Sequence, residues 1–321
     1  MSAAMGRVGV LYGGVSAERE VSLMSGEGVC KALRKRGVDA HLFDTAERSL
    51  AELAAAQFDK VFIALHGRYG EDGTLQGALE LLGIPYTGSG PMASAIAMDK
   101  VMTKKIWLQA GIPTPDFLVL DQNNTQEALK AKLKQAPDRL GLPLIMKPAH
   151  EGSTVGFTLV EQEAMLSKAL TLALRYDQRV LAERFIAGRE LTIPVLGYGH
   201  QAYALPVIEI VVPEDAFYDY EHKYHSQETQ YFCPAKLPQT LAQQLQSLAV
   251  TAYRAIDCAG WGRVDLMLDK DQNAWLLEIN TSPGMTAQSL VPMAAKAQGL
   301  SYEDLCFGIL QSASLKVQTM E

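Results

Sequence analysis

Apolar and polar positions follow two different periods in the first part of the chain. Three short, mostly apolar runs are typical of buried strands: residues 7–12, 38–43 and 60–65. Between the first two, apolar residues from Val21 to Leu33 recur at helical spacing. Ser16 is the expected N-cap of this helix, and Gly37 is its expected C′ residue. Strands that alternate with helices predict a parallel sheet with helices on its faces, so we expect an α/β domain over residues 1–100.

The pattern of the remaining residues predicts two further domains, over 101–186 and 187–321. In the first, it predicts helices at 100–110 and within 123–141, and strands at 144–147, 157–160 and 180–185. In the second, it predicts strands at 191–196 and 202–210, a polar and aromatic loop at about 213–233, and a helix at 238–257.

The stretch from Trp261 to Met285 is the most informative part of the sequence. Two apolar runs, 263–268 and 274–280, flank a short segment with turn chemistry, and this pattern predicts a β-hairpin. We centre its turn between Asp271 and Gln272.

This register brings a polar set of side chains to one face of the hairpin, because side chains alternate between faces. Asp265 falls opposite Glu278, and Arg263 falls opposite Asn280. The other face is entirely apolar: Val264, Leu266, Leu268, Trp275, Leu277 and Ile279. A slip of one residue would bury the charged set, so the register is well determined.

The opposed carboxylates would lie about 4.5–5.5 Å apart at Cβ, where like charges repel. Arg263 compensates in part, but a cluster of Asp, Glu and Asn oxygens is what Mg²⁺ prefers, usually shared with substrate phosphates. The alternative is a polar hairpin that simply faces solvent. Lys147 precedes a glycine-rich loop at 151–156, whose N–H groups can wrap phosphate oxygens. This loop is not a Walker A motif, and Gly13-Gly14 fails the GxGxxG pattern, so a nicotinamide-dependent dehydrogenase is poorly supported.

Composition and charge exclude several classes of protein. The net charge is −7 and the sequence pI is near 5.5, which argues against nucleic acid or an anionic membrane as a partner. Uninterrupted apolar runs stay far below the roughly 20 residues of a membrane span, and no signal peptide is visible, so we expect a soluble, cytoplasmic protein. The scattered cysteines are expected to be free thiols: Cys30, Cys233, Cys258 and Cys306.

Several strings, in order along essentially the whole chain, resemble D-alanine–D-alanine ligases of the ATP-grasp superfamily. They are residues 13–22, 66–67, 70–74, 86–90, 98–100, 147–148, 151–153, 217–224 and 278–286. The Glu-x-Asn string at 278–280 is shared by the wider superfamily. The Ser-Ala-Glu-Arg-Glu string at 16–20 and the Tyr-Asp-Tyr-Glu-His-Lys-Tyr string at 218–224 are far narrower.

The resemblance implies an ATP-grasp fold of the α/β class (α+β overall). Its N-terminal domain would be a Rossmann-like parallel-sheet domain. ATP would lie between the central and C-terminal domains. The implied reaction converts the carboxylate of one D-alanine into an acyl phosphate, which the amine of a second D-alanine attacks. The product, D-alanyl-D-alanine, serves peptidoglycan synthesis. The resemblance also implies two Mg²⁺ ions, with Mn²⁺ as an alternative. It further implies a homodimer and a mobile loop at about 213–233.

The resemblance assigns ATP and metal contacts to residues of several elements: Asp265, Glu278 and Asn280 to the metal ions, Lys100, Lys147 and Lys223 to phosphates, and Glu183 and Glu190 to adenine and ribose. Arg263 and the Gly284 N–H would stabilise the tetrahedral oxygen. Met267 and Leu276 face the site by parity and are candidates for the floor of the adenine pocket, with plain core packing as an equal alternative.

The D-alanine contacts implied by the resemblance come from both ends of the chain: Glu18 and His66 at the first D-alanine, Ser289 and the Leu290 backbone at the second, and Ser153 and Tyr224 in a hydrogen-bonded triad with Glu18. Three of these residues also have a plain structural interpretation. Glu18 is a first-turn acid that suits the helix dipole, His66 a structural hydrogen-bonding group, and Ser289 a helix N-cap.

Two residues bear on specificity. Tyr224 favours D-alanine as the second substrate, because relatives that use D-lactate tend to carry Phe or another residue there. Arg184 stands where close relatives have Lys, and its bulkier planar group changes the adenine contact. A ligase that uses D-lactate is the near alternative. A nucleotide-binding regulatory protein would show damage to the metal ligands or to Arg263, and none is seen.

Overall fold

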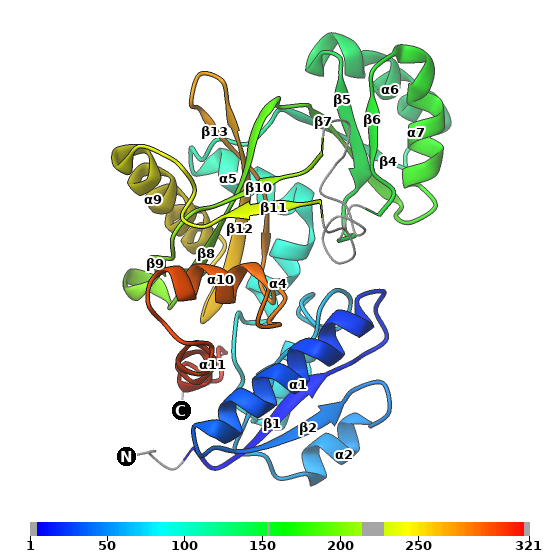
Figure 1. The fold of residues 1–321 in the computed structure, drawn as a ribbon. Helices are drawn as coiled ribbons and strands as arrows, with labels where there is room; N and C mark the ends of the chain where they lie inside the picture. Colours follow the sequence, from blue (N-terminus) through cyan, green and yellow to red (C-terminus); the bar gives the residue numbers. More distant parts are fainter. Residues whose placement is uncertain (1–4, 153–154, 214–227, 318–321) are drawn as a thin grey trace.

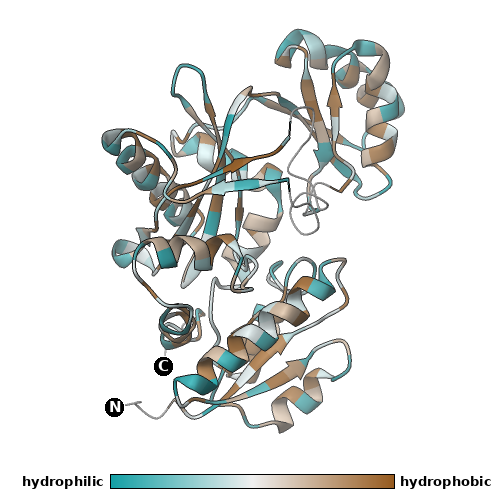
Figure 2. Ribbon diagram, in the orientation of Figure 1, coloured by the Kyte–Doolittle hydropathy of each residue, from teal (hydrophilic) through white to brown (hydrophobic). Residues whose placement is uncertain are grey.

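The computed structural model describes residues 5–152, 155–213 and 228–317, which form three β-sheets (Figure 1). The sheets follow one another along the chain, with strands between residues 7 and 63, 117 and 184, and 188 and 280. Apolar residues are concentrated on the strands and on the helix faces that cover them, whereas polar residues lie on the outer faces (Figure 2).

The first sheet is parallel, as predicted. Strand β1 (Arg7–Tyr12) lies between β2 (Asp39–Asp44) and β3 (Lys60–Ile63). The helices that connect its strands or follow them are α1 (Arg19–Lys35), α2 (Leu50–Ala55) and α3 (Thr74–Leu82).

Both predicted ends of α1 can be checked against the structure. Gly37 occupies the C′ position with φ +77°, and the Val38 N–H donates to the Leu33 carbonyl, which closes a Schellman motif as expected. The predicted N-cap is wrong, because the N-cap position is that of Glu18. Ser16 lies two residues earlier, where its hydroxyl donates to the His66 carbonyl at 2.8 Å.

The second sheet is antiparallel and has one face covered by helices. Its order is β4 (Phe117–Asp121), β7 (Arg179–Arg184), β5 (Leu144–Pro148) and β6 (Thr158–Val160). Helix α6 (Gln126–Leu140), a 3₁₀ turn (Glu163–Met165) and α7 (Leu166–Ala173) lie on its outer side (Figure 1). Leu144 and Met146 pack against these helices, so the alternating residues Ile145 and Lys147 point to the opposite face.

The third sheet is antiparallel, and it contains the predicted hairpin. Its order is β11 (Gln230–Phe232), β10 (Ile208–Val211), β8 (Gly188–Leu196), β12 (Trp261–Asp269) and β13 (Ala274–Asn280), and β9 (Tyr203–Ala204) pairs with β8 after a 3₁₀ turn (Gly199–Gln201). The single strand predicted at 202–210 is therefore wrong. It is interrupted at 205–207, where Pro206 cannot donate to a strand ladder.

Helices from three parts of the chain cover the third sheet. Helices α4 (Pro91–Met98), α5 (Lys100–Gln109) and α9 (Gln239–Ala255) share an apolar core with β8, β12 and β13. Helix α10 (Leu290–Ala297) and helix α11 (Tyr302–Gln311) join a core that also contains residues of α1 and β1. Helix α11 lies beside α1 (Figure 1), so the C-terminal end of the described chain holds the first sheet to the third.

The hairpin of β12 and β13 has the predicted register only at the end that carries Arg263 and Asp265. Arg263 pairs with Asn280 and Asp265 with Glu278, as predicted, but the register shifts between Asp265 and Leu266, so that Leu266 pairs with Leu276. This β-bulge adds one residue to β13. The turn is consequently centred on Asp271 and not between Asp271 and Gln272.

The bulge changes which side chains of β13 face the core. Val264, Leu266, Leu268 and Ile279 are buried in the core, as predicted. Leu276 is fully buried with them, so the prediction that it faces the site is wrong. Leu277 lies on the opposite face and lines a cavity next to Glu278, contrary to the apolar face assigned to it. Trp275 pairs with Met267 and is only partly buried, so it also lies outside the predicted core.

Candidate active site

A cavity of about 520 Å³ lies between the second and third sheets, within the size range of ligand pockets. The second sheet contributes residues of β5, β7 and the 151–157 segment to its lining. The third sheet contributes residues of β8, β10 and the β12–β13 hairpin. Seven of the residues predicted to contact ATP, metal or adenine line this one cavity: Lys100, Lys147, Glu183, Glu190, Asp265, Met267 and Glu278.

One end of the cavity is strongly charged. Lys100 is nearly buried, and its Nζ lies 3.3 Å from Glu278 Oε2 and donates to the Glu151 carbonyl at 2.6 Å. It therefore connects the carboxylate of the hairpin to the start of the glycine-rich loop. An ammonium group in this position can contact a phosphate that replaces part of these interactions.

Asp265 is held in a fixed orientation by three neighbours. Arg263 donates to both of its oxygens, at 2.8 and 2.7 Å, and Asn280 Nδ2 donates to Oδ2 at 3.0 Å. The Thr192 hydroxyl also donates to Oδ1. Such a network fixes the carboxylate and leaves no rotamer freedom to lose when a ligand binds.

The donor chemistry at this end fits a hard divalent cation. Asp265 and Glu278 are paired across two strands, and Asn280 adds a carbonyl oxygen two residues further on. In the described residues, no group of three or more His, Cys, Asp and Glu side chains is arranged to hold a metal ion by itself. A set of only two carboxylates and one amide is typical of Mg²⁺ sites that are completed by substrate phosphates and water.

The buried carboxylate of Glu183 connects the charged end of the cavity to β7. It is 2% exposed and lies between two lysines, with Lys104 Nζ 2.6 Å from Oε2 and Lys147 Nζ 3.1 Å from Oε1. Burial alone would raise the pKa of Glu183, but the two ammonium groups hold it below its usual range. Glu183 is therefore an ionised acceptor at the cavity wall.

Lys104 was not singled out from the sequence. It is fully buried, also donates to the Thr114 hydroxyl, and lies 3.5 Å from the Leu276 carbonyl in the bulged part of β13. Burial lowers its pKa to about 8, with Glu183 acting in the opposite direction. The available signal was its spacing: Lys104 follows Lys100 by four residues and so lies on the same face of α5.

The other end of the cavity is apolar. Ile145, Phe157, Ile186, Met267 and Leu277 all line it. Met267 was predicted here correctly, whereas Leu277 takes the place of Leu276 because of the bulge. An apolar lining next to an ionised acceptor suits a heteroaromatic ring that carries an amino group.

Arg184 lies at the rim of this apolar end. Its guanidinium carbon lies 4.4 Å from the centre of the Trp275 ring, a cation–π contact between β7 and β13. Its Nε is buried and has no hydrogen-bond partner among the residues that the structure describes. The residue that departs from the pattern of close relatives is thus a contact between the two sheets as well as part of the cavity wall.

A second group of predicted residues lies where the first sheet meets the third. His66 is 5% exposed, with Nδ1 2.7 Å from the Ser282 carbonyl and Nε2 3.2 Å from Ser25 Oγ. Burial lowers its pKa, so the imidazole is neutral. Both ring nitrogens are used in holding α1 to the segment after β13, which supports the structural interpretation of His66.

Glu18 faces two loops from other parts of the molecule. A Cβ on Gly67 would lie 3.2 Å from Glu18 Oε2, and a Cβ on Gly152 would lie 3.7 Å from the same atom. The carboxylate at the start of α1 therefore lies against the glycine-rich loop. Ser153 follows Gly152 directly but lies outside the described residues, as do Lys223 and Tyr224 and most of the predicted loop at 213–233.

Glu71 is a further acidic residue in this region that sequence reasoning missed. It accepts a hydrogen bond from the Gly67 N–H at 2.8 Å. Desolvation, and then the nearby Glu18 carboxylate, raise the pKa of Glu71 to about 8. The sequence signal was present in the Gly-Glu-Asp-Gly-Thr string, which carried the resemblance but received no role.

The remaining predicted residues lie on the segment between β13 and α10. A Cβ on Gly284 would lie 3.1 Å from Ser289 Oγ, and 3.8 Å from Val21 of α1. Ser289 occupies the N-cap position of α10 but makes no side-chain cap; its hydroxyl accepts from the Thr286 N–H instead. Leu290 begins the helix and is buried. The structure thus brings Gly284, Ser289 and Leu290 next to α1.

The fold and the site define a class. Two sheets that enclose a nucleotide-sized cavity lined by lysines and by a carboxylate hairpin are the arrangement of ATP-grasp proteins. Two family models match this chain: the D-ala D-ala ligase N-terminus at residues 43–89 and the D-ala D-ala ligase C-terminus at residues 106–311. The chain belongs to the D-alanine–D-alanine ligase family, and the resemblance found in the sequence is confirmed.

Individual relatives cover almost the whole chain. A D-alanine–D-alanine ligase of Bordetella petrii is 66% identical, over 98% of this chain and 94% of its own. One from Herminiimonas arsenicoxydans is 57% identical, over 99% and 94%. The crystal structure of the D-alanine–D-alanine ligase from Bacillus anthracis complexed with ATP is 34% identical, with a TM-score of 0.80 over 95% of this chain and 96% of that one. The VanG D-Ala:D-Ser ligase from Enterococcus faecalis is 29% identical, with a TM-score of 0.84 over 95% and 98%.

Two simpler expectations can also be compared with the structure. None of the four cysteines forms a disulfide: Cys30, Cys258 and Cys306 are buried and Cys233 is partly buried. None of the helices in the described part of the chain has the length and apolar character needed to cross a bilayer.

Proposed function

We propose that this chain is an ATP-dependent ligase that joins two D-alanine molecules into D-alanyl-D-alanine for peptidoglycan synthesis. One observation carries the chemistry. The paired carboxylates of Asp265 and Glu278 share a cavity wall with Lys100, and Lys147 faces the same cavity from the second sheet. The lysines attract the negative charge of a polyphosphate, and the carboxylates suit the Mg²⁺ that such a substrate brings with it. The family supplies the identity of the substrates.

The reaction needs ATP because a carboxylate is a poor acyl donor. An oxygen of the first D-alanine carboxylate forms a bond to the γ-phosphorus, and the bond from that phosphorus to ADP breaks. The amine of the second D-alanine then attacks the carbonyl carbon and loses a proton, and the tetrahedral intermediate expels phosphate. Each step places negative charge on oxygens, which is why cations surround this end of the cavity.

We assign ATP to the cavity between the second and third sheets, hereafter the ATP cavity, with the phosphate and metal contacts at its charged end. Lys100 and Lys147 bind phosphate oxygens, and Lys223 does so on the basis of the resemblance. Asp265, Glu278 and Asn280 hold Mg²⁺, with Mn²⁺ as an alternative. When bound, these ions would neutralise the negative charge of the phosphates. Glu183 accepts from the adenine amino group, and Glu190 contacts ribose.

We assign the D-alanine contacts to the junction of the first and third sheets. Glu18 accepts from the ammonium of the first D-alanine, beside neutral His66. Arg263 and the Gly284 N–H donate to the tetrahedral oxygen. Ser289 and the Leu290 N–H bind the carboxylate of the second D-alanine. Ser153 and Tyr224 complete the triad with Glu18 on the basis of the resemblance.

We also propose that the chain acts as a homodimer in the cytoplasm, with three domains over 1–100, 101–186 and 187–321. The dimer is proposed from the family resemblance, and Leu81 on α3, which is 92% exposed, is an apolar side chain that a subunit contact could cover. Sedimentation of the full chain, alone and with Leu81→Lys, tests the dimer. A wild-type chain that sediments as a monomer at micromolar concentration would contradict the proposed dimer.

The activity is tested by phosphate release from Mg·ATP with D-alanine, with the product identified by mass. L-alanine alone, D-alanine plus D-lactate, and D-alanine plus D-serine are the controls. We expect one D-alanyl-D-alanine for each phosphate released. Binding of Mg·ATP without release on addition of D-alanine would keep the fold and reject this substrate pair.

A further inference from the structure

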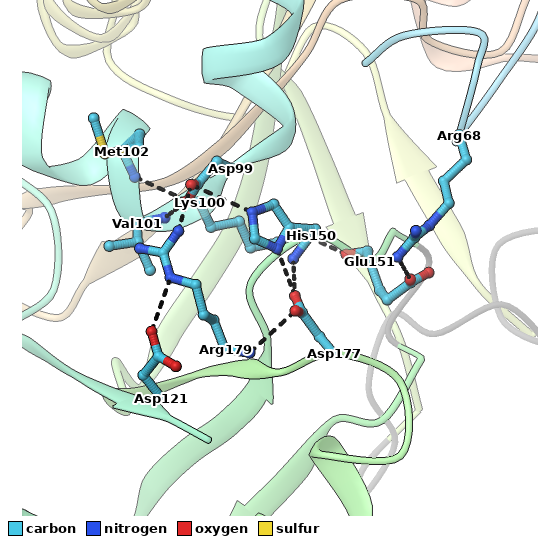
Figure 3. Close-up of polar contacts among 10 residues, drawn as sticks. All are labelled: Arg68, Asp99, Lys100, Val101, Met102, Asp121, His150, Glu151, Asp177 and Arg179. Atoms are coloured by element: carbon cyan, nitrogen blue, oxygen red, sulfur yellow. Dashed lines mark hydrogen bonds and ion pairs between the residues drawn. The ribbon is translucent and has the colours of Figure 1, made fainter. Parts of the chain in front are cut away.

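His150 lies at a junction of three segments just outside the ATP cavity. Its ring Nδ1 is 2.7 Å from Asp177 Oδ2, and its Nε2 is 3.3 Å from Asp99 Oδ2 (Figure 3). Nδ1 forms a hydrogen bond with Asp177, and Nε2 lies within ion-pair distance of Asp99. An imidazolium carries a proton on each ring nitrogen, so this cationic form suits a position between two carboxylates.

The two carboxylates are themselves fixed to the backbone. Asp99 is the N-cap of α5, and its Oδ1 accepts from the N–H groups of Val101 and Met102 at 2.9 and 3.0 Å. Asp177 accepts from the backbone N–H of His150 at 2.8 Å. The histidine thus connects the first turn of α5 to the segment before β7 (Figure 3).

Both sequence neighbours of this network belong to the candidate phosphate site. Lys100 follows Asp99, and Glu151 follows His150, and both line the ATP cavity, whereas His150 does not. The Lys100 N–H donates to the Ala149 carbonyl at 3.1 Å, and its Nζ donates to the Glu151 carbonyl at 2.6 Å. A shift of α5 relative to residues 149–151 would therefore move the lysine away from the loop.

We propose that His150, as an imidazolium, is a positioning residue for phosphoryl transfer, because it clamps the Asp99–Lys100 junction to the beginning of the glycine-rich loop. The clamp sets the place of the Lys100 ammonium relative to the backbone of Glu151 and Gly152. It acts through these neighbours and does not touch the phosphates. This inference rests on the proposed function, since phosphate binding at Lys100 and the loop is part of it.

Carboxylates favour the cationic form of His150, and two arginines also lie nearby and partly neutralise them. Arg179 donates to Asp99 Oδ2 at 2.8 Å and lies 3.9 Å from Asp121, while Arg68 is paired with Glu151 at 2.7 Å (Figure 3). Hydrogen bonds to Asp177, and then to Asp99, raise the pKa of His150 to about 9, although burial acts in the opposite direction. A raised pKa means that the clamp contributes fully below the usual pKa of histidine, near 6.5, and is lost as the pH rises through about 9.

The test compares His150→Gln, which can hydrogen-bond but carries no charge, with His150→Arg, which keeps the charge. Phosphate release at saturating D-alanine gives kcat and the KM for ATP from pH 7 to 10. We expect His150→Gln to raise the KM for ATP about tenfold at pH 7, the loss of one charge-assisted contact, with a smaller change in kcat. His150→Arg should restore the KM and remove its rise near pH 9, which the wild type should show.

His41→Gln is the matched control, because His41 forms a histidine–aspartate pair with Asp39 at 2.8 Å on the exposed end of β2. It should leave the KM and its pH profile unchanged. A wild-type KM for His150→Gln at every pH overturns the proposal. So does a loss of activity in His150→Gln that follows a lower melting temperature and is not rescued by arginine. If the wild type releases no phosphate with D-alanine, the proposed function fails instead, and Mg·ATP affinity by calorimetry on the same variants still tests the clamp.

Discussion

The charge balance of the buried lysine–glutamate cluster depends on single side chains. Lys104 is fully buried and lies 2.6 Å from Glu183, which also pairs with Lys147 at 3.1 Å. Removing one partner of a buried pair leaves the other charge without full compensation. We expect Lys104→Met to lower the free energy of unfolding by about 3 kcal/mol, measured by urea denaturation. Lys105→Met, on the exposed side of the same helix, is the control, and an equal effect of the two changes would contradict the cluster.

Glu278 offers a change that separates catalysis from stability. Its side chain faces the cavity and lies outside the apolar core, so Glu278→Gln should keep the melting temperature within a few degrees of the wild type. The same change removes a negative oxygen from the proposed metal site and the partner of Lys100. We expect kcat for phosphate release to fall by a factor on the order of 100 or more at saturating Mg²⁺. Full turnover of a folded Glu278→Gln variant would refute the metal assignment.

At the scale of elements, the bulge in β13 gives two adjacent leucines opposite roles. Leu276 is fully buried in the core of the third sheet, whereas Leu277 lines the ATP cavity. Leu276→Ala should lower the free energy of unfolding by about 2–5 kcal/mol, the range for a buried leucine. Leu277→Ala should destabilise the fold less and raise the KM for ATP about fivefold or more, because it removes an apolar contact worth roughly 1 kcal/mol or more. A regular hairpin predicts the reverse, so urea denaturation and ATP kinetics on this pair decide between the two registers.

The hairpin also shows how far the sequence alone leads. Alternation predicts the pairing of Asp265 with Glu278, because a slip there would bury charge. Between Trp275 and Leu277, three apolar residues follow one another, and alternation cannot say which of them is the extra one. In the structure, the Leu276 N–H donates to the Pro113 carbonyl, and the Thr114 hydroxyl donates to the Leu276 carbonyl. These contacts come from a segment far away in the sequence, so the bulge depends on tertiary structure.

The elements and residues around the site differ in how far the sequence alone could predict them. Periodicity predicted the first sheet, α5 and three strands of the second sheet, because each has a clear apolar pattern with turn residues at its ends, but it missed β4 (Phe117–Asp121). The D-alanine contacts at Glu18, His66 and Ser289 came from the resemblance, since each has an ordinary structural interpretation by itself. Lys104 was missed because a lysine on a helix is normally exposed, and only the position of Glu183 on another element makes it buried.

At the scale of the whole molecule, the second sheet is attached differently from the other two. The first and third sheets share a large apolar core through α1, α10 and α11. The second sheet meets the rest through a small apolar cluster around Val101 and Leu181 and through polar contacts. These include the buried Lys104–Glu183 pair, the pairing of His150 and Arg179 with Asp99, and the stack of Arg184 on Trp275. Because the ATP cavity lies at this boundary, contacts that hold the second sheet should affect nucleotide binding more than global stability.

The stack of Arg184 on Trp275 tests this idea directly. A desolvated cation–π contact is worth about 1–2 kcal/mol, which corresponds to a change in the KM for ATP of roughly 5- to 30-fold. We expect Trp275→Leu and Arg184→Leu each to raise the KM for ATP within this range and to leave the main unfolding transition nearly unchanged. Since the two groups act on each other, the double variant should be no worse than the more severe single one.

Trp275→Phe, which keeps a ring face but loses the Nε1–H bond to Asp269 at 2.9 Å, should have a KM for ATP between those of the wild type and Trp275→Leu. Additive effects of the two single changes would mean that the residues act independently on adenine and that the second sheet is held by its other contacts alone.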